Sequence, residues 1–200
     1  GSSHNFKTSI INYGTIENYP DNSYVLTIDG SVTNNGIIHN NVYDLFLNIS
    51  GNLTNNGVWT NRSTVMNGAV NQSVSMSQPF GGYSFERVNT NGRLQATSNL
   101  SFSNTIITLN SDTLEFTTGN SIIMNGGCLN PGILYKTTPP TLKITAGGGN
   151  YIYDQIIDAP QTELYGVIMI YGNNHNFKNS VINNGTLQNR PNNAYLLTVN

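Results

Sequence analysis

The amino-acid sequence predicts an all-β protein, a parallel β-solenoid with coils of about 21 residues. Three observations lead to this prediction: a long repeat between the two ends of the sequence, a shorter repeat inside it, and columns of matched residues that alternate with period two. Such columns are typical of β-strands, in which successive side chains point to opposite faces.

The long repeat relates residues 4–29 to residues 175–200. The segment HNFKTSIINYGTIENYPDNSYVLTID returns as HNFKNSVINNGTLQNRPNNAYLLTVN, with 15 of 26 positions identical at a constant offset of 171. We therefore expect residues 1–171 to be one full tandem repeat and residues 172–200 to begin the next repeat in the same continuous solenoid. In a longer array a coil like residues 30–36 would follow Asn200, and each repeat would add roughly eight coils, or about 40 Å.

The shorter repeat gives the length of one coil. Residues Leu26–Ile38 match residues Leu47–Trp59 at an offset of 21. Asn-Gly pairs recur in these segments, and both residue types tolerate the positive φ of a tight corner. A strand, a corner and a second strand are therefore expected in each coil.

An asparagine column is the most informative of the matched columns. Stacked amides hydrogen-bond to one another along the axis of a stacked structure, so these asparagines are expected to turn inward as a ladder. Beside them, Ile16, Ile38 and Trp59 are expected to form an apolar stack. The four residues of the predicted ladder are Asn12, Asn34, Asn55 and Asn183.

Two folds use Asn-Gly corners. An antiparallel hairpin array would place Asn-Gly between strands of equal length and does not need identical residues in phase every 21 positions. A parallel solenoid stacks each coil on the last, so equivalent residues lie about 4.8 Å apart. The columns in phase favour the solenoid.

These residues give the sequence a resemblance to a known family. The TNNG motifs at Thr33–Gly36 and Thr54–Gly57, the INYG and INNG motifs in the two copies of the long repeat, and the asparagine column resemble the right-handed parallel β-helix of the pectin-lyase-like superfamily. Within this superfamily, the sequence resembles the β-helical repeats of bacterial cell-surface and adhesin-like proteins. The resemblance covers residues 1–61 and 175–200, and it implies a right-handed helix at an extracellular or cell-surface location.

The middle of the sequence departs from the pattern. Residues Gln72–Arg87, QSVSMSQPFGGYSFER, break the 21-residue register and are expected to form an enlarged loop or a bulged coil. Alternating segments follow, LSFSNTIITL and DTLEFTTGNSIIM, and these are expected to be strands.

Composition and charge exclude several classes of function. Only 9% of the residues are charged, while 34 of 200 are asparagine, which suits stacked columns because stacked like charges repel. A net charge of −2 offers no surface for nucleic acid, and no apolar stretch reaches the ~18 residues of a membrane-spanning helix. The single Cys128 excludes an internal disulfide framework; it is either a buried small apolar residue or a thiol for an intermolecular bond.

The titratable residues do not form a catalytic pattern. Among the acidic residues only Asp154, Asp158 and Glu163 form a cluster of three in the sequence, and the first two would be roughly 13 Å apart on one strand. Glycoside hydrolysis needs about 5–9.5 Å between carboxylates. His4 and His175 hold the same place in the long repeat, so we expect one structural position seen twice. No metal-binding spacing or nucleotide loop occurs, so we expect no enzyme activity, no cofactor and no metal.

Aromatic residues are the remaining candidates for binding. Tyr151 and Tyr153 are expected to share one face of a strand and are candidate glycan contacts, and Tyr83 with Phe85 has the same spacing. The alternative is that these aromatic side chains cover corners and the ends of the core.

Two classes of function stay open. The first is a structural or adhesive repeat unit of a long extracellular surface protein or filament, whose partners are copies of itself and surface glycans. The second is a carbohydrate-binding or polysaccharide-processing β-helix. The tandem repeat favours the first, since a catalytic β-helix does not need the same coil to recur at a long and fixed offset. An ice-binding solenoid would need a flat and regular threonine array, and the threonines scatter along the sequence.

Overall fold

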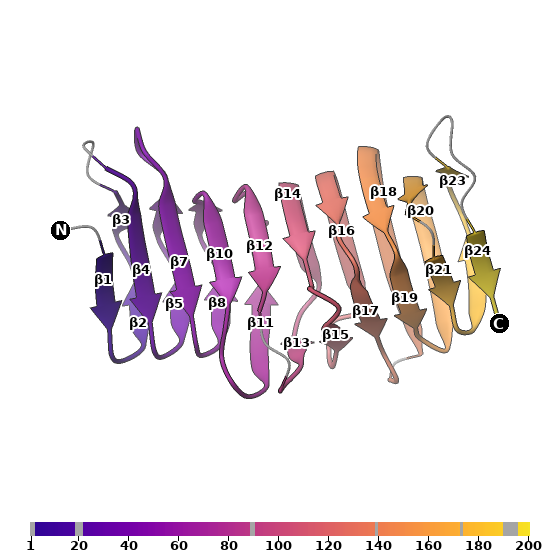
Figure 1. The fold of residues 1–200 in the computed structure, drawn as a ribbon, viewed down its shortest axis with the longest axis horizontal. Helices are drawn as coiled ribbons and strands as arrows, with labels where there is room; N and C mark the ends of the chain where they lie inside the picture. Colours follow the sequence, from indigo (N-terminus) through magenta and orange to yellow (C-terminus); the bar gives the residue numbers. More distant parts are fainter. Residues whose placement is uncertain (1–2, 19–21, 89–90, 139, 173, 190–195) are drawn as a thin grey trace.

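A computed structural model describes residues 3–18, 22–88, 91–138, 140–172, 174–189 and 196–200. Within these ranges the chain forms strands β1 to β24, and the sheets join them in non-consecutive order, as parallel coils require. Figure 1 shows the strands standing side by side from the N-terminal end of the long axis to the C-terminal end. The prediction of an all-β parallel solenoid is confirmed.

The strands lie on three faces, which the chain visits in a fixed order in each coil. Face 1 begins with β1, face 2 with β2 and face 3 with β3. Each face continues through the strands that stack on these in later coils. The largest sheet contains β1 (Ser3–Phe6), β4 (Tyr24–Ile28), β7 (Leu45–Ile49), β10 (Ser63–Met66), β12 (Ser84–Arg87), β14 (Leu100–Thr108), β16 (Ser121–Leu129), β18 (Thr141–Tyr153), β20 (Gln161–Tyr171), β22 (Ser180–Asn183) and β23 (Thr186–Asn189). Face 2 contains β2 (Ile10–Asn12), β5 (Val32–Asn34), β8 (Leu53–Asn55), β11 (Gln72–Met76), β13 (Leu94–Ala96), β15 (Thr113–Phe116), β17 (Gly132–Tyr135), β19 (Gln155–Asp158), β21 (Asn174–Phe177) and β24 (Leu196–Val199). The smallest sheet contains β3 (Thr15–Glu17), β6 (Ile37–His39) and β9 (Val58–Thr60).

In β14, β16, β18 and β20, one long strand covers both face 3 and face 1. Phe80 bridges Trp59 of β9 to Phe102 in the first half of β14, which continues face 3. The second half of β14 pairs with β12 on face 1, where Ile106 lies opposite Ser84. The same division holds for β20, whose first half pairs with β22 and whose second half pairs with β23.

The coils keep close to the predicted length. Positions offset by 22 or 21 lie opposite each other in the first coils, as in Ile10 with Val32 and Val32 with Leu53. The prediction that Gln72–Arg87 would leave this register is wrong, because Val74 pairs with Leu53 and Ser84 pairs with Ser63, both at the predicted offset of 21. The coil before this segment is short, because the offset falls to 17 between Phe46 and its partner Ser63.

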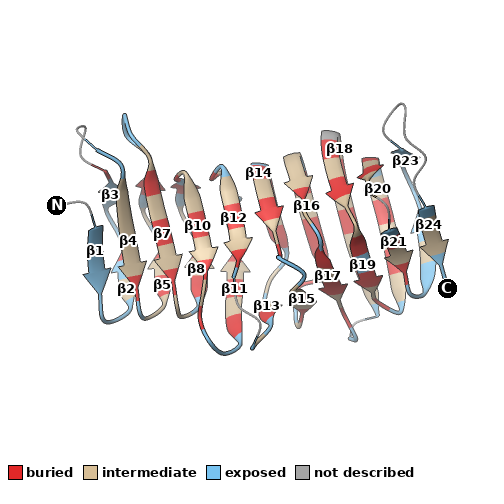
Figure 2. Cartoon of the chain, in the orientation of Figure 1, coloured by how far each residue is buried: buried red, intermediate tan, exposed pale blue. Residues whose placement is uncertain are grey.

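The core runs the length of the solenoid. Buried and half-buried residues alternate along the strands, as period-two side-chain geometry requires (Figure 2). The predicted stack of Ile16, Ile38 and Trp59 is confirmed on face 3. Aromatic rings extend it, because Phe80 lies 5.9 Å from both the Trp59 and Phe102 rings, measured between centroids.

Two cationic side chains are buried inside the coils. The Arg87 side chain is fully buried, and its Nε lies 3.0 Å from Asp112 Oδ2. Its terminal nitrogens donate to the carbonyl oxygens of Met66, Gly68 and Gly92 and to the side-chain oxygen of Gln72. In the second case, Lys136 Nζ donates to three carbonyl oxygens, the nearest being Gly119 O at 2.7 Å, and burial lowers the pKa of Lys136.

The two copies of the long repeat lie on different faces. β1 is on face 1, but its counterpart β21 pairs with β19 on face 2. The following strands are displaced in the same sense: β2 and β22 lie on faces 2 and 3, β3 and β23 on faces 3 and 1, and β4 and β24 on faces 1 and 2. The expectation that His4 and His175 are one structural position seen twice is therefore wrong.

Candidate functional site

The asparagine ladder forms at the corner between faces 2 and 3. Asn12 Nδ2 donates to Asn34 Oδ1 at 2.8 Å, and Asn34 Nδ2 donates to Asn55 Oδ1 at 3.0 Å. Each of these amides also accepts the backbone N–H of the glycine two residues later, as Asn34 Oδ1 does from Gly36 at 3.2 Å. The ladder is buried and fixes the stacking of three coils.

Asn183 lies in β22, far along the axis from the other three asparagines. Its Cα partner in the neighbouring coil is Leu164, and its side chain is exposed. Its Oδ1 nevertheless accepts the Gly185 N–H at 3.2 Å, as Asn12 Oδ1 accepts the Gly14 N–H at 3.1 Å. The local corner is thus repeated, while its place in a further ladder stays a prediction.

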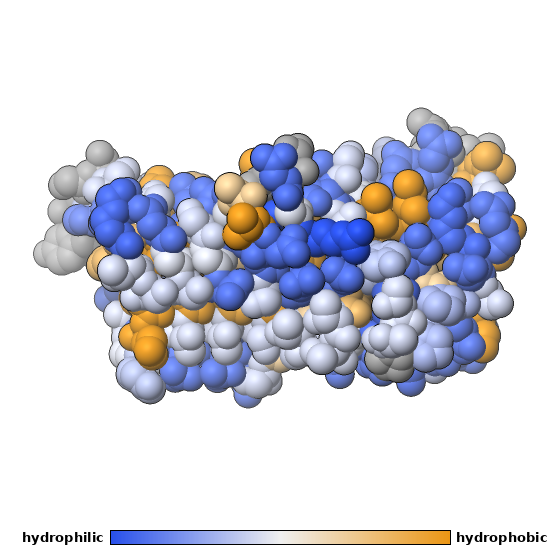
Figure 3. All heavy atoms as spheres, turned by 90° about the horizontal axis from the view of Figure 1, so that it is seen from below, coloured by the Kyte–Doolittle hydropathy of each residue, from blue (hydrophilic) through white to orange (hydrophobic). Residues whose placement is uncertain are grey.

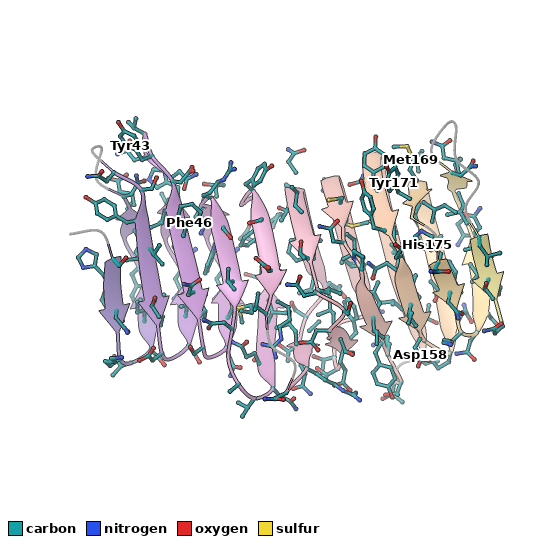
Figure 4. The ribbon with its side chains drawn as sticks, viewed as in Figure 1. Tyr43, Phe46, Asp158, Met169, Tyr171 and His175 are labelled. Atoms are coloured by element: carbon teal, nitrogen blue, oxygen red, sulfur yellow. The ribbon has the colours of Figure 1, made fainter. Side chains whose placement is uncertain are left out.

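A group of tyrosines lies on the outer side of face 1. Tyr151 and Tyr153 flank the buried Ile152 in β18, with ring centroids 6.5 Å apart. Tyr171 of β20 lies opposite Tyr153 with a centroid distance of 4.6 Å, and Met169 lies opposite Tyr151. Figure 4 shows Met169 and Tyr171 close together near the same end of β20.

Tyr151 and Tyr153 thus share one side of a strand as predicted. The sequence does not predict the contact with Tyr171, because this contact depends on the register between coils.

The two residues of the other aromatic pair, Tyr83 and Phe85, lie in different environments. Phe85 is buried in the core, while Tyr83 is 49% exposed and lies under the guanidinium group of Arg62 at 3.9 Å. Phe85 thus fits the alternative in which these aromatic side chains fill the core, and it does not share an outward face with Tyr83.

A groove of about 530 Å³ runs over the outer side of face 3. Ile37 and Val58 form an apolar floor and are 40% and 50% exposed. Asn35 and Asn56 form one edge, where Asn56 Nδ2 donates to Asn35 Oδ1 at 2.9 Å. The residues that line the groove carry no charged side chain: Asn35, Gly36, Ile37, Asn56, Gly57, Val58, Trp59, Thr60, Gln78, Pro79, Gly81 and Ser103. The groove therefore suits a neutral ligand that offers both apolar and hydrogen-bonding surface.

The carboxylates near the end of the chain lie in different places. Asp154 stands at a corner with φ of 39°, where its Oδ1 accepts the Asn174 N–H at 2.7 Å. Asp158 ends β19 on face 2. Glu163 lies in the first half of β20, where it accepts the Tyr165 hydroxyl at 2.6 Å and is 3.7 Å from Lys143 Nζ. These three carboxylates are close in sequence but lie on separate parts of the coil.

Several other carboxylates pair with basic side chains across neighbouring coils. Lys7 Nζ is 2.9 Å from Asp29, and Arg93 is 3.5 Å from Glu115. Residues 3–18, 22–88, 91–138, 140–172, 174–189 and 196–200 contain no group of three or more His, Cys, Asp or Glu side chains placed to hold a metal ion. In the same ranges no helix has the length and apolar character to cross a bilayer.

Threonine and serine side chains form one outward column on face 2. Thr33 lies opposite Thr54, and Thr54 lies opposite Ser75. Two of the threonines are thus stacked, and a serine continues the column. The next outward column on this face is mixed, since Gln95 in it lies opposite Ser73 and Glu115.

Apolar surface is dispersed. On the side of the molecule that Figure 3 shows, apolar side chains lie in small separate groups among hydrophilic ones. Tyr43 and Phe46 lie near the N-terminal end, and Met169 and Tyr171 lie near the C-terminal end (Figure 4).

Comparison of the chain with protein-family models, with curated proteins and with solved structures finds no match in any of the three.

Proposed function

We propose that this chain is a structural and adhesive repeat unit of a long extracellular surface protein or filament, in which copies follow one another head to tail along a continuous solenoid. One observation carries the proposal. The pairing of β1 with β4 joins Ser3 to Val25, and the pairing of β21 with β24 joins Asn174 to Leu196, which are the corresponding positions of the second copy. The second copy thus begins with the same strand pairing, in the same register, as the first copy.

The way the coils are held together supports a role in building length. Each coil contacts its neighbours through parallel backbone pairing and the stacked core, and the asparagine ladder adds to these contacts in the first three coils. Stability in such a fold is approximately a sum of similar coil-to-coil terms, so further copies extend it without a new core.

A relationship to the right-handed parallel β-helices of bacterial adhesin-like proteins belongs to this proposal. It is supported by the TNNG motifs, whose asparagines Asn34 and Asn55 stack inward. An extracellular or cell-surface location is part of the same proposal.

We also propose that the chain is not an enzyme. The paired carboxylates support this, since Asp112 binds a buried arginine and Asp29 binds a lysine. A polysaccharide-processing site would need two carboxylates facing one groove, and the groove on face 3 is lined by neutral residues.

A test of the proposal uses antibodies raised against the folded chain on intact cells of the source organism. We expect immunogold particles in rows along thin surface fibres. Labelling confined to the cell interior after permeabilisation would contradict the proposal.

Binding of a neutral carbohydrate is the second candidate. The groove with its amide edge and the three outward tyrosines favour it, because sugar rings pack on apolar and aromatic surfaces and hydrogen-bond to amides. A glycan array probed with the chain tests this candidate: specific binding that is lost in Val58→Asp supports a carbohydrate site in the groove, whereas no binding to the array contradicts it.

A further inference from the structure

We propose that successive repeats in the array are related by a screw operation of eight coils and one face, so that every surface feature turns by about a third of a turn from one copy to the next. The inference rests on the proposed tandem array. It is carried by the displacement of the repeated segment from face 1 to face 2.

The summed length of eight coils explains the displacement. Along face 1, Ser3 is followed at successive coils by Val25, Phe46, Ser63, Ser84, Ile106, Cys128, Tyr151 and Met169. Eight coils therefore carry the chain from position 3 to position 169, which is an offset of 166. The repeat has the larger offset of 171, so the counterpart of Ser3 is Asn174, five positions beyond Met169 and already on face 2.

Short coils cause the difference. The offset is only 17 between Phe46 and Ser63, and only 18 between Tyr151 and Met169. Eight coils of the regular length would instead consume about 168 to 176 residues and would bring the second copy close to the face of the first. The advance is thus a property of coils inside the repeat, and each further copy with the same coils adds the same advance.

The repeated segment has local chemistry that works on either face. The Asn-x-Gly corner forms with the same hydrogen bond at Asn12 and at Asn183. Gly14, the counterpart of Gly185, stands in the first coil, so the comparison for stacking is Gly36, the same corner one coil later: a Cβ on Gly36 would lie 2.1 Å from Gly14 O, and one on Gly185 would lie 2.2 Å from Gly166 O. The preceding coil thus supplies a backbone carbonyl in both places, which lets the segment stack on face 3 as it stacks on face 2.

The screw has a consequence for adhesion. Three repeats make 25 coils, or about 120 Å, before a feature returns to the same face. The groove over Ile37 and Val58 would appear on each of the three faces in turn, about 40 Å apart along the axis. A rod of this kind presents binding surfaces on all sides, so several copies can engage a partner surface whatever the rotation of the rod.

Cysteine pairs test the displacement in the present chain, with Cys128→Ser as the background. Ile156 and Asn176 lie opposite each other on face 2, and neighbouring Cα atoms about 4.8 Å apart are within reach of a disulfide. We expect Ile156→Cys with Asn176→Cys to cross-link on mild oxidation. A repeat in phase would put Asn176 beside Tyr153, so Tyr153→Cys with Asn176→Cys is the matched pair and is expected to stay reduced. Cross-linking of the second pair and not the first would overturn the displacement.

A chain that contains residues 1–171 three times in succession tests the screw itself. Val70 is 68% exposed, so one Val70→Cys per copy in the Cys128→Ser background gives accessible sites for gold particles. By cryo-electron microscopy we expect three particles about 40 Å apart that turn by about a third of a turn at each step. Particles in a straight line along a rod would overturn the screw and leave the proposed array intact. Separate globules instead of a rod would overturn the array and the screw together.

Discussion

His4 and His175 hold the same place in the repeated segment, yet His4 is exposed in β1 on face 1, whereas His175 is only 2% exposed in β21 on face 2. The environment of a residue in this solenoid is therefore set by the coils around it as well as by the repeat. His175 Nε2 lies 3.0 Å from Tyr171 O, and burial lowers the pKa of His175 despite the opposing effects of that carbonyl and of Asp154.

The buried histidine predicts a pH dependence of stability. Because the folded-state pKa of His175 is lowered, the unfolded chain takes up a proton at this site below about pH 6.5 while the folded chain does not. The free energy of unfolding should therefore fall between pH 7.5 and pH 5. In urea titrations, His175→Gln should flatten this slope. An equal slope in His175→Gln and the parent chain would contradict the prediction.

The ladder predicts a stability cost for one buried amide. In Asn34→Leu, Asn12 loses an acceptor, Asn55 loses a donor and the Gly36 N–H loses its acceptor. We expect a loss of about 1–3 kcal/mol in the free energy of unfolding. The exposed Asn56 is the control, and Asn56→Ala should cost less than about 0.5 kcal/mol. Similar midpoints of chemical denaturation for the two variants would argue against the ladder.

The buried Arg87 predicts a larger loss of stability than the ladder does. In Arg87→Met, Asp112 loses its buried partner and several carbonyl oxygens lose a donor, so the free energy of unfolding should fall by about 3–5 kcal/mol. The half-exposed Arg62, 3.8 Å from Asp44, gives the matched variant. Arg62→Met should cost about 1 kcal/mol or less by the same denaturation measurement. A cost for Arg87→Met no greater than that for Arg62→Met would show that the buried network adds little.

The corner glycines of the first two coils predict different effects of alanine substitution on thermal stability. A Cβ on Gly36 would lie 2.1 Å from Gly14 O, whereas one on Gly14 has no other atom within 4 Å. Gly36→Ala must push two coils apart and should lower the thermal midpoint by several degrees, while Gly14→Ala should leave it nearly unchanged. Equal effects of the two substitutions would contradict close stacking at this corner.

The sequence predicts the fold well where identical residues recur in phase. The columns through Asn34 and Trp59 are read directly from the 21-residue offset, and the structure stacks them as expected. The segment Gln72–Arg87 carries no repeat signal in its sequence, because its ladder position is taken by Met76 and its stack position by Phe80. The geometry of the coil persists there, although the residue types that mark it change.

Some features could not be predicted from local sequence patterns. Arg87 lies two residues after the buried Phe85 and therefore points to the same inner side of the strand, but an arginine gives no apolar signal for an inward position.

Other features depend on the lengths of the coils. The contact of Tyr171 with Tyr153 depends on the short register between β18 and β20. The change of face between His4 and His175 needs the length of all eight coils between them, which differ from one another by several residues.

The length of the array tests the central claim most directly. Chains that hold residues 1–171 once, twice and three times, each followed by residues 172–200, can be compared by small-angle X-ray scattering. A continuous solenoid predicts that the maximum dimension grows by about 40 Å with each added repeat while the cross-sectional radius stays constant. Growth by a smaller and irregular amount, with a cross-section that widens as repeats are added, would contradict a continuous stack of coils.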